Sequence, residues 1–199
     1  MTDLFDVVHR QRACRSFSDE PVGDQLVERL LDAATFAPSA ENRQPWVFVV
    51  VRDPEVRAKV HDLTERAWAG GGRAMAESRL DDALLEEVDR GITGGGYRGA
   101  PVLVVVAADT DRCLDATIAS SIFPATQNVL LAATALGLGS ALTTLTTAFA
   151  DELSALLALP RSVVPQVVIP LGHPARPLGA PRREPFAEHT HRDRYGTPW

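Results

Sequence analysis

The stretch APSAENRQPW (37–46), which runs directly into the apolar segment VFVVV (47–51), decides more about this chain than any other part of its sequence. Prolines near both ends of the stretch fix φ and remove backbone N–H groups, so the loop between them is predicted to be rigid. Within it, Ser39, Asn42 and Gln44 can both donate and accept hydrogen bonds. Five consecutive apolar residues then predict a buried strand. A rigid polar loop at the mouth of a strand suits a small planar polar ligand, although an ordinary surface turn has a similar composition.

A second informative segment lies near the N-terminus. The sequence RQRACRSF (10–17) places three arginines within six positions. A guanidinium group binds phosphate through two parallel hydrogen bonds, so this cluster predicts an anion site. The alternative is a solvated basic helix end, which the helix dipole also favours.

Together the two segments resemble the nitroreductase family of flavin enzymes. That family carries Arg-Arg-Ser-x-Arg-x-Phe near its start and Pro-Ser-x-x-Asn-x-Gln-Pro-Trp about one helix later, where this chain has QRACRSF (11–17) and PSAENRQPW (38–46). The second match is close and the first is partial. Gln11 replaces an arginine, Ala13 replaces a serine, and Glu41 stands where relatives more often have a small residue. These departures predict an FMN site weaker than is usual for the family.

The resemblance extends along most of the chain in the expected order. The further segments that carry it are APVLVVV (100–106), QNVLLAA (127–133), LGLGS (136–140), LGHP (171–174) and RREP (182–185). Residues 60–98 match nothing specific, so the sequence leaves their role and the acceptor specificity open. The resemblance implies a single nitroreductase-like domain over 1–199, of α/β (α+β) class, with a central mixed, mainly antiparallel sheet flanked by helices.

The function that the resemblance implies is an FMN-dependent oxidoreductase. NADH or NADPH would reduce the flavin, and a nitroaromatic, quinone or similar small acceptor would then take the hydride, in a ping-pong scheme that assigns no catalytic side chain. The family also implies a homodimer with FMN at the subunit interface. Two alternatives stay open: a flavin enzyme with another reaction, such as oxidative dehydrogenation or reductive dehalogenation, and a flavin-binding protein without turnover.

The same resemblance assigns the cofactor contacts. Arginines at both ends of the chain would bind the phosphate, the polar loop would meet the edge of the isoalloxazine ring, and the glycine turn would offer a backbone N–H to the reduced flavin. The residues assigned to FMN are Arg12, Ala13, Arg15, Pro38, Ser39, Ala40, Asn42, Gln44, Leu138, Gly139, Arg182 and Arg183.

Composition narrows the remaining classes. The chain has 20 basic and 26 acidic residues and a formal charge of −6, which argues against a dedicated nucleic-acid binder. Its two cysteines, Cys14 and Cys113, favour a reducing cytoplasm over a disulfide framework. The N-terminus shows no signal-peptide pattern, and no apolar run reaches the ~20 residues that span a bilayer. The histidines near the C-terminus lack metal-ligand spacing, so no metal site is expected.

Periodicity and punctuation predict the elements. Asp53 is expected to cap a helix that begins at Pro54, and Ser121 to cap another that ends near Leu136. The five glycines in 91–99 predict a flexible loop or lid. The other expected helices are 3–11, 24–36, 74–90 and 149–158, and the expected strands are 47–52, 101–107, 141–146 and 165–171.

Overall fold

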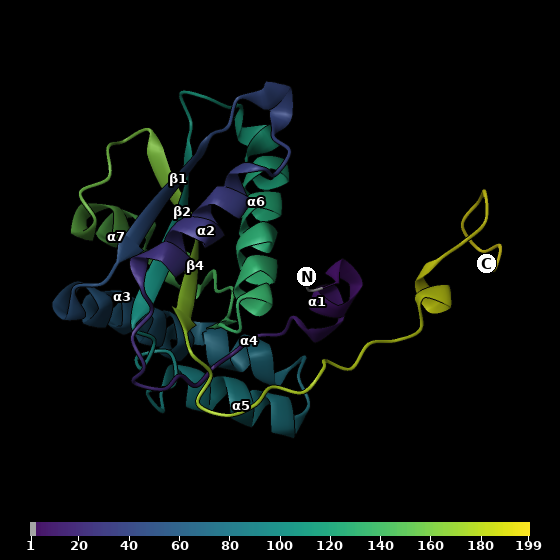
Figure 1. Cartoon of the computed structure of the whole chain (residues 1–199), viewed down its shortest axis with the longest axis horizontal. Coiled ribbons are helices and arrows are strands. Elements are labelled where there is room, and N and C mark those ends of the chain that lie inside the picture. The colour runs from purple at the N-terminus through teal and green to yellow at the C-terminus, as the bar shows by residue number, and fades with distance from the viewer. Residues whose placement is uncertain (1–2) are drawn as a thin grey trace.

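A four-stranded sheet lies at the centre of the molecule, with helices on both of its faces (Figure 1). The computed structural model describes residues 3–199. The strands are β1 (Trp46–Val51), β2 (Val102–Asp109), β3 (Gly139–Ser140) and β4 (Val163–Gly172), in the spatial order β1-β2-β4-β3. All pairings between these strands are antiparallel, and one isolated parallel bridge joins Ala13 to Ser140. The predicted α/β class with a mainly antiparallel sheet is confirmed.

Strand β2 explains the two layers of helices. Successive side chains of a strand point to opposite faces. Val104 and Val106 therefore join one buried cluster, while Leu103 and Val105 join another. The first cluster is completed by α2 (Asp24–Thr35) and α6 (Asp115–Ala135). The second is completed by α3 (Pro54–Ala67), α5 (Asp82–Ile92) and α7 (Ala150–Leu156).

Local signals placed several helices correctly. The Asp53 carboxylate accepts hydrogen bonds from the backbone N–H groups of Glu55 and Val56, each at 2.9 Å, and Pro54 occupies the first helical position of α3. Helix α1 (Leu4–Arg10) and helix α7 also fall where the sequence predicts them.

The single helix expected over 74–90 is wrong. The chain forms a π-helical turn η2 (Trp68–Gly72), then α4 (Arg73–Glu77), and a separate helix α5. The Asp81 carboxylate accepts from the Leu84 N–H at 2.8 Å and so starts α5 as a new helix. The capping signal was present in the sequence and was read as part of a continuous helix.

The expected start of α6 is also wrong. The helix begins at Asp115, so Ser121 lies in its interior and Pro124 interrupts its hydrogen bonding rather than opening it. Ser121 is fully buried because its hydroxyl accepts a hydrogen bond from the Ala40 N–H at 3.2 Å. A tertiary contact, and not a cap, explains this serine.

The strand expected over 141–146 is largely absent. Only β3 pairs regularly with β4, and Thr143 adds one isolated bridge to Val168. The chain then turns into the 3-10 helix η3 (Leu145–Phe149). The Thr143 hydroxyl accepts from the Leu145 N–H at 3.2 Å, which favours this turn over a continued strand.

Beyond β4 the chain leaves the body as an extended segment (173–199) that passes α5 and projects past α1 (Figure 1). Its one short helix is η4 (Phe186–His189). Among the described residues, no helix has the length and apolar character needed to cross a membrane.

Candidate functional site

A cavity of about 510 Å³ lies where the N-terminal segment, α5 and the chain after β4 meet. Four arginines line it, namely Arg12, Arg15, Arg90 and Arg176, together with one carboxylate, Glu87. The cavity is therefore positively charged within an acidic protein. Low-dielectric walls that carry one sign of charge focus the field of a cleft, so this site favours anions.

Arg12 and Arg15 both reach towards Glu87. Arg15 Nη1 lies 2.8 Å from Glu87 Oε1, and Arg12 Nη2 lies 3.6 Å from the same oxygen. Arg12 also donates a long hydrogen bond of 3.4 Å to the Gly179 carbonyl. Arg15 Nε is buried and has no hydrogen-bond partner among the described residues. Both arginines thus have donors to offer a bound anion.

Backbone contacts fix the segment that carries these arginines. The Cys14 N–H donates to the Ser140 carbonyl at 2.8 Å, and Phe17 forms a bridge with Pro174. A Cβ on Gly139 would lie 2.6 Å from Cys14 Sγ, so only glycine allows the strand to approach this closely. The expected site residues Leu138 and Gly139 are buried behind this segment, and neither appears in the described lining of the cavity.

The glycine-rich stretch 91–99 forms the floor of the cavity. Ile92 and Tyr97 are buried, and the Tyr97 N–H donates to the Gly91 carbonyl at 2.7 Å. A Cβ on Gly96 would overlap the Arg15 carbonyl oxygen. The expectation of a flexible loop or lid is therefore wrong, because these glycines are needed for close packing against Arg15.

Three buried titratable groups lie in or near this region, and all of them favour the neutral form. Burial is the main cause of a raised pKa for the Cys14 thiol and for the Tyr97 phenol. Burial also lowers the pKa of His61 to about 4, and His61 Nε2 has no described hydrogen-bond partner. None of these groups is poised for proton transfer near neutral pH.

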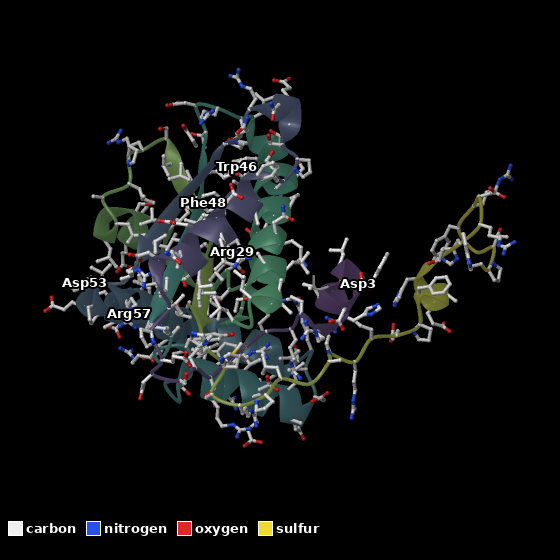
Figure 2. The ribbon with its side chains drawn as sticks, viewed as in Figure 1. Asp3, Arg29, Trp46, Phe48, Asp53 and Arg57 are labelled. Atoms are coloured by element: carbon white, nitrogen blue, oxygen red, sulfur yellow. The ribbon has the colours of Figure 1, made fainter. Side chains whose placement is uncertain are left out.

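The Pro38–Trp46 loop lies at the other end of the sheet. Trp46 pairs with Ala108 at the loop end of β1, whereas Val51 pairs with Leu103 at the end near the cavity. Figure 2 shows Trp46 at one end of the strand and Asp53 just beyond the other. Six residues of β-strand span about 17 Å. Within one chain, the structure does not bring the loop and the arginine cavity together.

The loop itself is held in an unusual conformation. Glu41, Asn42 and Gln44 have φ values of 53°, 54° and 50°, a left-handed region that non-glycine residues rarely adopt. The Ser39 hydroxyl accepts from the Gln44 N–H at 3.0 Å, and the Gln44 amide donates to Asn42 Oδ1 at 3.4 Å. Such strain costs of order 1 kcal/mol or more per residue and is concentrated at functional sites. The exposed Pro38 and half-buried Ala40 complete this loop.

Arg182 and Arg183 lie on the extended segment after β4, beyond the point where Gly179 contacts Arg12. Both are exposed, and Arg183 donates to the neighbouring Arg182 carbonyl at 2.8 Å. The structure shows no contact between them and the cavity arginines among the described residues. Sequence reasoning missed Glu87 altogether, because no motif marks a lone glutamate on an amphipathic helix.

Comparisons with known proteins define the class to which this fold and site belong. The model of the nitroreductase family matches residues 8–173, and the chain belongs to that family. A protein of Methanothermobacter thermautotrophicus, provisionally named an NADH dehydrogenase/NAD(P)H nitroreductase, is 29% identical over 186 residues, which cover 89% of this chain and 80% of that protein.

A solved structure gives the nearest view of a ligand. The nitroreductase of Desulfitobacterium hafniense with bound FMN has a TM-score of 0.76 and 25% identity, and the match covers 97% of this chain and all of the other. A shorter stretch of 63 residues is 33% identical to rat iodotyrosine deiodinase 1, and it covers 32% of this chain and 22% of that enzyme. The resemblance inferred from the sequence motifs is thereby confirmed.

Proposed function

We propose that this protein is a homodimeric, FMN-dependent NAD(P)H oxidoreductase that reduces nitroaromatic, quinone or similar small acceptors. In this proposal residues 1–199 form a single FMN-binding domain that works in the reducing cytoplasm. The unpaired thiols of Cys14 and Cys113 agree with that compartment. The observation that carries the proposal is the arginine cavity, which joins an N-terminal segment and a strained loop typical of a flavin family.

The residues of the cavity fit the phosphate of FMN. A phosphate dianion needs fixed cations, and Arg12 and Arg15 present guanidinium groups that share a single carboxylate. The partnerless Arg15 Nε supplies a further donor at the same place. When bound, FMN would supply the hydride-transfer chemistry, while the protein binds, orients and shields it.

The loop would bind the polar edge of the flavin in the partner subunit's site. Its exposed amide groups, Asn42 and Gln44, lie at the end of β1 remote from the cavity. A second copy that brings its loop to the first copy's cavity would complete a site from two chains. The extended tail could carry Arg182 and Arg183 to a neighbouring subunit in the same way, since it projects away from its own body (Figure 1).

Exposed apolar side chains support such a dimer. On α1, Phe5 is 69% exposed, and on α6, Phe123 is 40% exposed. The sequence suggested that α6 is buried on nearly all sides, but within one chain its outer face stays partly open. Trp199 on the tail is likewise 60% exposed. Contiguous apolar surface of this kind marks protein–protein contacts.

Reductive dehalogenation is the second candidate reaction. The short stretch shared with iodotyrosine deiodinase favours it over oxidative dehydrogenation. The match covers about a third of this chain, so it supports a related flavin site more strongly than a shared substrate.

The proposal is tested by titrating the purified protein with FMN and recording its absorption spectrum under anaerobic conditions, before and after addition of NADH or NADPH. Stoichiometric FMN binding and loss of the oxidised-flavin bands are expected, followed by their return when a nitroaromatic or quinone is added. A protein that binds no FMN would refute the proposal. Binding without reduction by either nucleotide would leave a flavin-binding protein without this activity.

A further inference from the structure

Glu87 is the only carboxylate among the described residues that line the arginine cavity. Its Oε1 atom accepts from Arg15 Nη1 at 2.8 Å and lies 3.6 Å from Arg12 Nη2. The side chain is 27% exposed, and those of Arg12 and Arg15 are 29% and 19% exposed. Glu87 thus occupies the space between the two guanidinium groups where an anion would bind.

The neighbours of Glu87 restrict how this arrangement can change. Gly91, one turn further along α5, would place a Cβ only 2.9 Å from the Arg15 Cβ. The turn that follows the helix packs against the Arg15 backbone through Gly96. The backbone of α5 is therefore held against the N-terminal segment. The glutamate side chain, with rotatable bonds and partial exposure, is the part that can move.

We propose that Glu87 is an internal counter-ion that an incoming phosphate displaces from Arg12 and Arg15, and that it thereby limits the affinity of the cavity for dianions. The inference rests on the proposed function only in taking the phosphate of FMN as the natural dianion. Two negative charges bind the paired guanidinium groups more strongly than one carboxylate, so displacement is favourable but costs part of the binding energy.

This role has opposite effects on the free and the bound protein. Without an anion, Glu87 neutralises two neighbouring arginines and stabilises the fold. With an anion bound, it is an additional negative charge close to the phosphate. Since both effects belong to one thermodynamic cycle, the loss of stability in a Glu87 variant must match its gain in affinity.

The test compares Glu87→Gln with the wild type, using Glu86→Gln as a matched control. Glu86 is the preceding residue on α5, lies outside the described lining and makes only a distant 3.9 Å contact with Arg90. Each variant removes one negative charge from the same helix. Affinities for FMN are measured by fluorescence quenching of apoprotein, affinities for inorganic phosphate by thermal shift, and stabilities by urea unfolding without ligand.

We expect Glu87→Gln to bind both FMN and phosphate about three- to tenfold more tightly, and to be less stable without ligand. Glu86→Gln should change the affinities by less than about twofold. Should Glu87→Gln fail to fold, Glu87→Asp shortens the reach to Arg12 while keeping the charge. It is expected to lie between the wild type and Glu87→Gln in affinity.

Weaker or unchanged anion binding in the Glu87 variants would overturn the inference, because Glu87 would then orient the arginines or remain paired beside the ligand. An equal gain in Glu86→Gln would also overturn it, in favour of a general charge effect. If phosphate binds more tightly to Glu87→Gln but no variant binds FMN, the counter-ion role stands and the proposed function fails.

Discussion

Replacement of Arg12 by alanine should weaken FMN binding without much loss of stability in the free protein. The Arg12 side chain is 29% exposed, and its contacts with Glu87 and the Gly179 carbonyl are long, at 3.6 and 3.4 Å. Its guanidinium group therefore contributes little to the folded state and is available to a ligand. Loss of a charge-assisted hydrogen bond to phosphate costs about 1.5–3 kcal/mol, or about ten- to a hundredfold in affinity. Partial exposure puts the expected value towards the lower end.

The assay is equilibrium titration of apoprotein with FMN at fixed ionic strength, because the interaction is screened by salt. Arg12→Lys should recover only part of the affinity, since an ammonium group keeps the charge but not the two-point geometry. Arg183→Ala should show a similar loss if the tail reaches a phosphate site. Arg66→Gln, which breaks a surface pair with Glu152, serves as the control. Unchanged affinity in both alanine variants would refute the assignment of the N-terminal segment and the tail to the cofactor.

Two further predictions concern the support of the site. His61 has a folded-state pKa of about 4 against a usual 6.5, so its stability contribution is complete above pH 6.5 and about 3 kcal/mol of it is lost as the pH falls to 4; urea unfolding should show this slope in the wild type, and its presence unchanged in His61→Gln would contradict the assignment. Gly96→Ala should destabilise the protein by about 2 kcal/mol or more by forcing Arg15 to move, and should weaken FMN binding with it. Gly23→Ala, where a Cβ meets nothing within 4 Å, should change neither, and equal effects in the two glycine variants would contradict the packing argument.

The sequence predicts the strands of the core well because burial on both faces demands uninterrupted apolar runs. The run VFVVV became β1, and the run at 102–106 lies within β2. The caps at Asp53 and Asp81 are local signals of equal strength, yet only the first was recognised, because it was followed by proline. Errors occurred where tertiary contacts override local pattern, as with Ser121, which holds the loop through Ala40.

For the site, sequence reasoning identified the cationic segment but not its arrangement in space. Arg12 and Arg15 line the expected cavity. The separation of the loop from that cavity depends on the direction and length of β1, which no motif encodes. Glu87 could not be predicted, since its role comes from the way α5 packs against the N-terminal segment. Packing of that kind joins residues 72 positions apart in the chain.

The central claim, a flavin site shared by two chains, is tested most directly by complementation between two damaged subunits. One chain carries Arg12→Ala and Arg15→Gln in the cavity, and the other carries Asn42→Ala and Gln44→Ala in the loop. Each homodimer should lose FMN. Heterodimers, isolated by two different affinity tags, combine one intact site with one doubly damaged site if each site draws on both chains.

The measurement is the FMN content of the purified heterodimer, with the wild-type dimer handled in parallel. The account predicts that the heterodimer regains half of the wild-type FMN, together with half of its NAD(P)H-dependent flavin reduction. If each site were built from one chain, every site in the heterodimer would stay damaged. A heterodimer with no more FMN than either damaged homodimer would therefore contradict the shared site.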